Sequence, residues 1–188
     1  LVMTAPLPAL SKIEWAMPAE RRRLMESVEY HKVLQAHLVV EAPYWEQRGQ
    51  SGSWWTDGQL GRIFVRPIPG TERYNLTVWI NGDECDALDA MPKADCQAEI
   101  MKQLYALVPD AKGAVSEGDV VRWSSDPYAG GVWSLWRPGQ AAEAHAALRT
   151  PLGRAYFAGE HTAISYRGME GAMESGERAA LEVARMLS

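Results

Sequence analysis

The chain has 188 residues, 47% of them hydrophobic and 23% charged, with eight Trp and seven Tyr against only two Phe. This size suits one domain or one and a half, and the apolar content excludes a disordered chain. The formal net charge of −5 argues against a basic surface that binds nucleic acid. The sequence contains no run of eighteen apolar residues, so no membrane span is predicted. The surplus of Trp favours an aromatic cleft or an interface.

The N-terminal segment LVMTAPLPAL is apolar and has no initiator Met, so it resembles a strand entered in mid-protein. We expect a proteolytic fragment, one chain of a processed enzyme or a trimmed protein. Residues 1–5 are predicted to end a buried strand, and Pro6 and Pro8 to begin a turn, because proline removes a backbone donor. A helix is predicted over residues 18–28, with the three arginines at 21–23 on a solvated face.

The middle of the chain is predicted to be rich in β-structure. The segments HKVLQAHLVVEAPYW, GRIFVRPI and YNLTVWING have the apolar patterns of strands, and SGSWWTDG is predicted to be a turn or hairpin tip between the first two. From Lys93 onwards, apolar residues recur at every third or fourth position, which predicts an amphipathic helix that ends at Pro109. Its expected inner face consists of Ala94, Ala98, Met101, Leu104, Tyr105 and Val108.

The last third of the chain combines short strands with glycine-rich loops. VVRW and the AYFA of LGRAYFAGEHTAI are predicted to be strands, and GMEGAMESGERAALEVARML is predicted to be a helix. The expected buried face of that helix consists of Ala172, Met173, Gly176, Ala179, Ala180, Val183 and Met186. Gly168 and Gly171 at its start either present backbone N–H groups to an anion or only permit close packing, and the residues alone favour neither.

The remaining reactive side chains predict little chemistry of their own. Cys85 and Cys96, separated by ten residues, have neither metal-ligand spacing nor a disulfide-rich context, so a reduced, cytoplasmic setting is expected. We expect no metal site, because no His, Cys and carboxylate residues cluster at metal-ligand spacing. SGS and SSD lack the setting of a nucleophilic serine. His161 is expected to be a structural hydrogen-bonding group, and His145 to be exposed.

Three long segments together resemble one enzyme family. Arg154, the run AYFAGEHTA and then MEGAMESGERAA resemble the C-terminal FAD-binding motif of the flavin-containing amine oxidases, which include monoamine, polyamine and L-amino acid oxidases. RWSSDPYAGGVWSLWRPGQ is similar to the family segment in which Trp, an acidic residue, an aromatic residue and Gly-Gly precede the aromatic residue beside the flavin. LPALSKIEWAMPAERRRLMESVEYHKVLQAHLVVEAPYW is similar to the family's return strand, lysine, helix and following strand. The resemblance covers nearly the whole chain.

The resemblance implies FAD as the cofactor, bound non-covalently because Val132 stands where the covalently flavinylated monoamine oxidases have cysteine. It implies that Glu160 faces the ribityl and phosphate part of FAD and that Gly159 permits the close approach. Trp123 would pack along the flavin, with plain core packing as the alternative. The backbone at the helix start would stabilise negative charge on the reduced ring. The implied cofactor-binding residues are Trp123, Gly159, Glu160, Arg167, Gly168, Met169, Glu170, Gly171 and Ala172.

On the substrate side, the resemblance implies that Lys12 holds a water against the reactive nitrogen of the flavin. Without the resemblance, Lys12 would be interpreted as a solvated residue. Trp133 is implied to be one wall of the aromatic cage that receives the amine. Gly168 replaces the second wall of many relatives, which leaves room for a larger side chain or a carboxylate. Arg62 and Arg66 are the candidate carboxylate partners, with ordinary surface arginine as the alternative for each.

The implied architecture is α+β (α/β). Residues 1–10 would be the return strand of a Rossmann-like FAD-binding domain, residues 11–114 a substrate domain with a mixed sheet flanked by helices, and residues 115–188 the C-terminal strand and helix of the FAD-binding domain. The dinucleotide fingerprint G-x-G-x-x-G is absent from these residues. A companion chain or a missing N-terminal segment is therefore expected to carry it.

The implied reaction is the oxidative deamination of an L-amino acid, with O₂ as the second substrate and ammonia and hydrogen peroxide as products. A mono- or polyamine oxidase of the same family is one alternative, and a non-catalytic flavoprotein-like scaffold is another. We expect a homo-oligomer that has no nucleic-acid or membrane partner.

Overall fold

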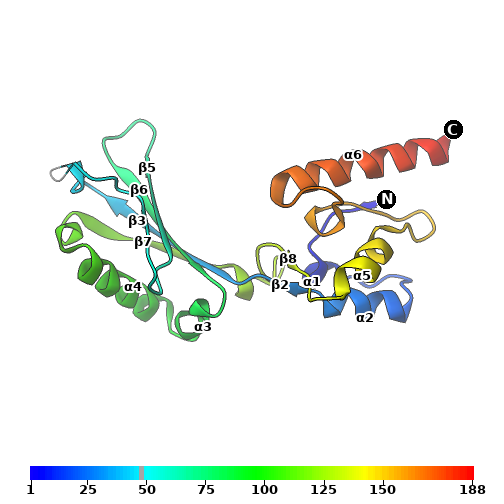
Figure 1. Cartoon of the computed structure of the whole chain (residues 1–188), viewed down its shortest axis with the longest axis horizontal. Helices are drawn as coiled ribbons and strands as arrows, with labels where there is room; N and C mark the ends of the chain where they lie inside the picture. Colours follow the sequence, from blue (N-terminus) through cyan, green and yellow to red (C-terminus); the bar gives the residue numbers. More distant parts are fainter. Residues whose placement is uncertain (47–48) are drawn as a thin grey trace. The chain divides into compact units, whose positions relative to one another are not determined.

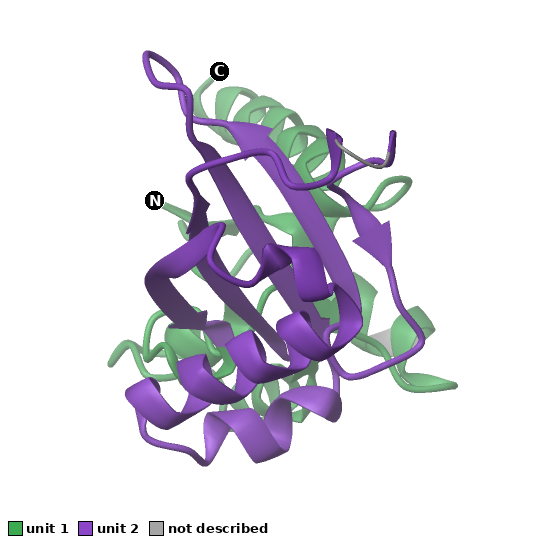
Figure 2. Cartoon of the chain, turned by 90° about the vertical axis from the view of Figure 1, so that its left-hand side faces the viewer, with its two compact units in different colours: residues 1–31, 124–188 green, residues 32–123 purple. Residues whose placement is uncertain are grey.

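The computed structural model describes every residue except 47 and 48, and the described residues form two compact units. Unit 1 comprises residues 1–31 and 124–188, and unit 2 comprises residues 32–123 (Figure 2).

Unit 2 is built on a five-stranded sheet with the strand order β4-β5-β6-β3-β7. Its strands are β3 (Val33–Val40), β4 (Trp54–Trp55), β5 (Arg62–Pro67), β6 (Tyr74–Asn81) and β7 (Val115–Arg122). One face is covered by helices (Figure 1), namely α3 (Glu84–Asp89) and α4 (Lys93–Leu107), and the turn η2 (Pro109–Ala111) follows α4. The core contains alternate residues of β3 and β6 and one face of α4, including Leu34, Ala36, Leu38, Leu76, Val78, Ile80, Ile100 and Leu104.

The predicted α+β class and the three predicted strands of the middle segment are confirmed. The named strands of unit 2 pair antiparallel throughout, where a mixed sheet was expected. The predicted turn at SGSWWTDG contains the short strand β4. Antiparallel neighbours need only short connections, which the chain provides between β4, β5 and β6.

β7 pairs with β3 across a register shift between His37 and Val39. Gly118 lies in β7 at this irregularity, and a Cβ there would stand 1.9 Å from the carbonyl oxygen of His37. Only glycine allows the two backbones to come this close, so Gly118 makes the bulge possible.

α4 has the predicted extent, and Met101, Leu104 and Val108 of its predicted inner face are buried in the core. Ala94 and Ala98 of the predicted inner face are exposed, whereas Cys96 and Ile100 are fully buried. The predicted period is confirmed, and the inner face differs from the prediction at Ala94 and Ala98, because burying Ile and Cys removes more apolar surface from water than burying alanine.

Unit 1 pairs short strands from distant parts of the sequence. β1 (Val2–Met3) runs parallel to β9 (Tyr156–Phe157), and β2 (Glu29–Tyr30) runs antiparallel to β8 (Ser134–Leu135). Its helices are α1 (Leu7–Leu10), α2 (Ala19–Ser27), α5 (Gln140–Arg149) and α6 (Gly168–Leu187), with the turn η4 (Glu160–Thr162) before α6 (Figure 1). The turn η3 (Trp123–Ser125) contains the boundary between the units. The core of unit 1 contains Leu7, Leu10, Met25, Val28, Leu148 and Phe157.

The N-terminal strand is confirmed as β1, although Val2 is 41% exposed where a buried strand was predicted. The predicted turn after it is the one-turn helix α1. Pro8 lies in the first turn of α1, where a backbone N–H would have no helical partner, so proline is tolerated there.

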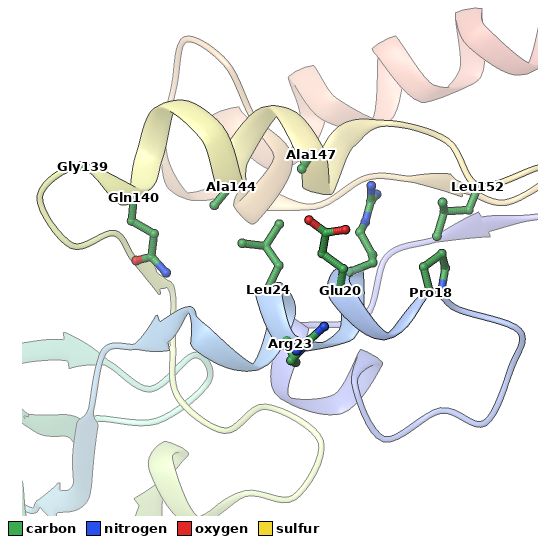
Figure 3. A pocket seen from close by; sticks show the side chains of 10 residues that line it. Pro18, Glu20, Arg23, Leu24, Gly139, Gln140, Ala144, Ala147 and Leu152 are labelled. Atoms are coloured by element: carbon green, nitrogen blue, oxygen red, sulfur yellow. The ribbon is translucent and has the colours of Figure 1, made fainter.

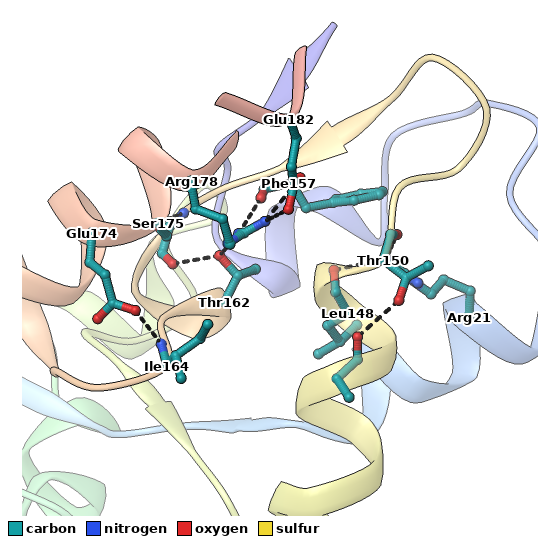
Figure 4. A network of polar contacts seen from close by, with 12 residues as sticks. Arg21, Leu148, Thr150, Phe157, Thr162, Ile164, Glu174, Ser175, Arg178 and Glu182 are labelled. Atoms are coloured by element: carbon teal, nitrogen blue, oxygen red, sulfur yellow. Dashed lines mark hydrogen bonds and ion pairs between the residues drawn. The ribbon is translucent and has the colours of Figure 1, made fainter. Parts of the chain in front are cut away.

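Arg21 is buried, so the predicted solvated face of residues 21–23 is wrong at its first position. Its guanidinium donates to the carbonyl oxygens of Leu148 and Thr150 at 2.8 and 2.7 Å and lies 4.7 Å from the centre of the Phe157 ring (Figure 4). Arg21 therefore closes the C-terminal end of α5, whose last carbonyl groups have no helical partners.

α6 is confirmed, and of its predicted buried face Ala179 is fully buried, whereas most of the other predicted residues are exposed. Gly171, Ser175 and Ala179 are the buried residues, whereas Met173 is 70% exposed. The packed side also holds Arg178, which donates to the carbonyl oxygen of Phe157 at 2.7 Å (Figure 4). In the described part of the chain, no helix combines the length and the apolar character needed to cross a membrane.

The compact units differ from the predicted domain limits of 1–10, 11–114 and 115–188. Residues 11–31 belong to unit 1, because α2 packs against α5 and Met25 joins the core there. Residues 115–123 belong to unit 2, because β7 completes its sheet. The functional domain limits stay a prediction.

Candidate functional site

The loop after β9 forms the predicted Gly-Glu corner. Gly159 has a φ of +128°, and a Cβ at this position would stand 2.6 Å from the ring of His161. The N–H of Gly159 donates to Oγ of Ser175 on α6 at 2.8 Å. Glycine therefore lets the backbone adopt this turn directly against the ring of His161.

Glu160 is held by a residue from a distant part of the sequence. Its carboxylate accepts the backbone N–H and the hydroxyl of Ser134, each at 3.1 Å, and its side chain is only 15% exposed. A guanidinium nitrogen of Arg167 lies 3.9 Å from the same carboxylate. Because Ser134 directly follows Trp133, the corner is connected to the segment that carries the predicted substrate wall.

Ser134 is fully buried and was not predicted as a site residue. The pairing of residues 134 and 160 depends on tertiary structure, and local periodicity carries no sign of it. Its place directly after Trp133 is the one available signal in the sequence.

The first turn of α6 keeps its backbone N–H groups free of a side-chain cap. Arg167 occupies the N-cap position without a capping hydrogen bond, and Gly168 has a φ of +64° with open space where a Cβ would be. The other predicted residues of this turn are exposed, namely Met169, Glu170 and Ala172. The turn can thus accept an electron-rich group.

Gly171 has a packing role. A Cβ there would stand 2.5 Å from the carbonyl oxygen of Tyr166 and 2.8 Å from Cβ of Ala163. Close packing therefore explains Gly171, whereas no neighbouring atom explains Gly168.

The loop that leads into α6 is held by Glu174, which was not predicted. The Glu174 carboxylate accepts the backbone N–H of Ile164 at 2.9 Å (Figure 4) and those of Ser165 and Tyr166 at 3.1 and 3.2 Å. These hydrogen bonds, that of Ile164 first, lower the pKa of Glu174. The carboxylate thus fixes the loop that precedes the predicted cofactor motif.

Two histidines lie in or beside this corner. Burial lowers the pKa of His161 to about 4, so its ring is neutral at pH 7, and its buried Nε2 atom has no hydrogen-bond partner. The hydrogen-bonding role predicted for His161 is therefore not seen at Nε2. His145 is half-buried rather than exposed, its ring meets that of Trp136 edge-on at 5.6 Å, and burial lowers its pKa.

A pocket of about 210 Å³ lies beside the corner in unit 1. Its lining residues are Trp136, Ala141, His145, Glu160, Ala163, Ile164, Ser165, Tyr166 and Arg167. The pocket therefore combines two of the predicted cofactor residues with aromatic and polar neighbours.

Lys12 and Trp133 both belong to unit 1. The Lys12 ammonium is exposed and donates to the carbonyl oxygen of Pro127 at 3.3 Å. Trp133 is half-buried, and its ring stacks on that of His31 with the centroids 4.7 Å apart. The structure thus attaches Lys12 to the same loop region that leads to Trp133.

Three predicted residues belong to unit 2. The Trp123 indole N–H donates to Oε1 of Gln35 at 2.9 Å. The guanidinium of Arg62 lies 4.3 Å from the centre of the exposed Trp55 ring, and Arg66 is exposed near the end of β5. Their predicted roles towards flavin and carboxylate stay predictions.

A larger pocket, of about 560 Å³, lies between α2 and α5 (Figure 3). Ala144 and Ala147 on α5 face Leu24 and Glu20 on α2 across it. It contains none of the predicted site residues. Among the described residues, no three His, Cys, Asp or Glu side chains gather as a metal site, and Cys85 and Cys96 are both free and buried.

Comparison with protein-family models matches residues 1–184 to the flavin containing amine oxidoreductases. The chain belongs to this family. Amine oxidase [flavin-containing] A of Equus caballus is 28% identical over 99% of the chain and 37% of its own length, and the L-amino-acid oxidase of Mus musculus is 26% identical over 97% and 30%. The chain therefore spans about a third of the length of these two curated relatives.

Solved structures support the same fold. Cyclohexylamine oxidase from Brevibacterium oxydans matches with a TM-score of 0.85 and 24% identity over 99% of this chain and 42% of its own. A putrescine oxidase variant matches with a TM-score of 0.83 and 21% identity over 98% and 42%. The predicted family and fold class are confirmed.

FAD is the cofactor of the flavin-containing amine oxidoreductases, which confirms the predicted cofactor. The residues of unit 1 fit such a group: Gly168 leaves open space at the uncapped start of α6, and Gly159 lets the backbone make the turn at the corner. The Glu160 carboxylate can accept hydrogen bonds from hydroxyl groups, and the first turn of α6 can face negative charge.

Proposed function

We propose that this chain is part of an FAD-dependent oxidase that deaminates an L-amino acid oxidatively. The amino acid, O₂ and water would give a keto acid, ammonia and hydrogen peroxide, by way of the imine. The observation that carries the proposal is the connection within unit 1 between the Glu160 corner and the segment bearing Trp133. A polar corner next to an aromatic wall suits a cofactor that lies beside an amine-bearing substrate.

Different residues of the chain would bind the cofactor and position the substrate. Glu160, Gly159 and the first turn of α6 bind and orient the cofactor, which supplies the oxidation chemistry when bound. Trp133 packs against the apolar part of the substrate, and Lys12 orients a water molecule. We propose non-covalent binding of FAD because Val132 has no nucleophilic side chain. Trp123 is proposed as a further flavin-side residue.

The open space at Gly168 supports an amino acid over a simple amine, because a glycine there leaves room for a carboxylate or a larger side chain. Arg62 and Arg66 are the proposed carboxylate partners, since a guanidinium can form a bidentate pair. A matched pair of substrates tests this choice: the complete enzyme should turn over an L-amino acid faster than the amine formed by its decarboxylation.

If the amine is the better substrate, the mono- or polyamine oxidase is the correct alternative, which the likeness to amine oxidase A of Equus caballus favours. If the purified enzyme lacks flavin absorbance near about 450 nm, the non-catalytic scaffold is correct.

The partners are proposals as well. A companion chain or a further segment would carry the dinucleotide fingerprint that these residues lack. We propose a cytoplasmic location, which fits two unpaired cysteines and is checked by cell fractionation. We also propose a homo-oligomer, which light scattering of the purified enzyme checks.

A further inference from the structure

We propose that His31 is a positioning residue that sets the plane of the Trp133 ring and thereby the selectivity for the apolar part of the substrate. The inference rests on the proposed function of Trp133 as a wall of the substrate site. The two rings are nearly parallel, with an interplanar angle of 12° and centroids 4.7 Å apart. Both side chains are half-buried and belong to unit 1.

The stack is built into the backbone. The antiparallel register of β2 and β8 continues past the ends of the strands and places His31 opposite Trp133. The His31 N–H donates to the carbonyl oxygen of Trp133 at 2.9 Å, and the Val132 N–H donates to that of His31 at 3.0 Å. Side chains that face each other across an antiparallel pair share one face of the ladder, so the two rings must meet.

The residues on either side of Trp133 fix its backbone. Gly131 has a φ of +140°, and a Cβ there would stand 2.6 Å from Cβ of Tyr30, so only glycine fits. Ser134 is fully buried and donates twice to Glu160. With the backbone held, the side-chain torsions of Trp133 decide where its ring lies, and the second torsion of Trp is broad when nothing restrains it.

His31 supplies that restraint. Among the described residues, it is the aromatic ring that stacks on Trp133. With one face of the indole covered by the imidazole, the opposite face is the one that can meet a substrate. A bulky apolar group depends on the position of that face, whereas a small side chain barely reaches it.

The complete enzyme with FAD tests the inference through three variants. His31→Ala removes the stack, His31→Phe keeps an aromatic ring at the same place, and His37→Ala is the matched control. His37 is half-buried in β3 of unit 2, and its Nδ1 lies 3.2 Å from Oγ1 of Thr77. We expect His31→Ala to raise the KM of a bulky apolar substrate about 3- to 10-fold, with kcat and the KM of a small substrate within about twofold. His31→Phe and His37→Ala should keep all these values.

NMR of histidine-labelled enzyme gives a readout without substrate. The indole ring current should shift the Cε1 proton of His31 upfield, and Trp133→Leu should abolish the shift. A missing shift, or an unchanged KM in His31→Ala while Trp133→Leu raises it, overturns the inference and leaves the proposed function standing. An enzyme that shows the shift but oxidises neither amino acid nor amine contradicts the proposed function and the inference with it.

Discussion

At the scale of single residues, the proposed role of Lys12 can be tested by substitution. Its ammonium is exposed and held by the carbonyl oxygen of Pro127, so it can donate a further hydrogen bond to a water molecule. We expect Lys12→Met to slow flavin reduction or reoxidation by about 100-fold while FAD stays bound, because methionine keeps the apolar stem and lacks the donor.

Stopped-flow absorbance of the flavin measures both half-reactions of the Lys12 variant. Lys102→Met on α4 is the control, since Lys102 is exposed and pairs with Glu99 at 2.8 Å. Equal rates of flavin reduction and reoxidation in the two variants would show that Lys12 has no role in the site.

Arg21 and Arg23 are close in sequence and differ in their surroundings. Arg21 is buried and donates to two carbonyl oxygens at the end of α5, whereas Arg23 is exposed. Arg21→Ala should lower the free energy of unfolding by about 3 kcal/mol, because hydrogen bonds to charged groups contribute about 1.5–3 kcal/mol each and the carbonyl groups lose their partner. Arg23→Ala should change it by less than about 0.5 kcal/mol. Urea unfolding at pH 7 compares them, and equal losses would contradict the structural role of Arg21.

At the scale of elements, Glu174 joins a loop to its helix. Its carboxylate accepts three backbone N–H groups, which lower its pKa in the folded protein. A carboxyl group with a lowered folded-state pKa adds stability above its unfolded pKa of about 4.3, and this stability is lost as the pH falls through the folded value. Glu174→Gln should therefore lower the Tm at pH 7. On acidification, the Tm of this variant should fall by less than that of the unsubstituted protein.

Thermal unfolding between about pH 7 and pH 3 measures this difference. Glu177→Gln, at an exposed position of the same helix, is the control. Parallel curves for the Glu174 variant and the unsubstituted protein would show that the hydrogen bonds do not form in solution.

The sequence predicts those elements whose signal is local. Alternation identifies β3 and β6, and the apolar period identifies α4 and α6, because one buried face is enough to set each period. The inner faces of α4 and α6 are predicted only in part, because several small residues compete for the inner face and tertiary packing decides between them.

In the candidate site, too, the features with a local sequence signal are predicted and those that depend on tertiary contacts are not. The Gly-Glu corner and the glycines of α6 are visible as a motif, since a positive φ favours glycine at Gly159 and close packing requires it at Gly171. The partners Ser134 and His31 are not visible as a motif. Ser134 meets Glu160 through hydrogen bonds across 26 residues, and His31 meets Trp133 through strand pairing across more than a hundred.

At the scale of the whole molecule, the chain spans 37% of one curated relative and 42% of one structural relative and lacks a dinucleotide fingerprint. Unit 1 also leaves large apolar side chains open to water around the start of α6. Ile164 is 60% exposed, Tyr166 65%, Met169 85% and Met173 70%. Exposed apolar groups gathered in this way are typical of an interaction surface, and we predict that a further polypeptide segment covers the part of it that the cofactor leaves free.

We therefore predict that the native enzyme contains a polypeptide, or a further segment of the same one, with the sequence G-x-G-x-x-G, and that it absorbs near about 450 nm. Purification through a C-terminal tag, followed by mass spectrometry and a visible spectrum, checks both points. Met173→Glu should weaken the association and release FAD, because it places a charge on a surface that becomes buried. Glu177→Lys, on the same helix, serves as the charge-changing control. A 20.9-kDa chain that holds one FAD by itself would contradict the prediction, since its own residues would then bind the whole dinucleotide.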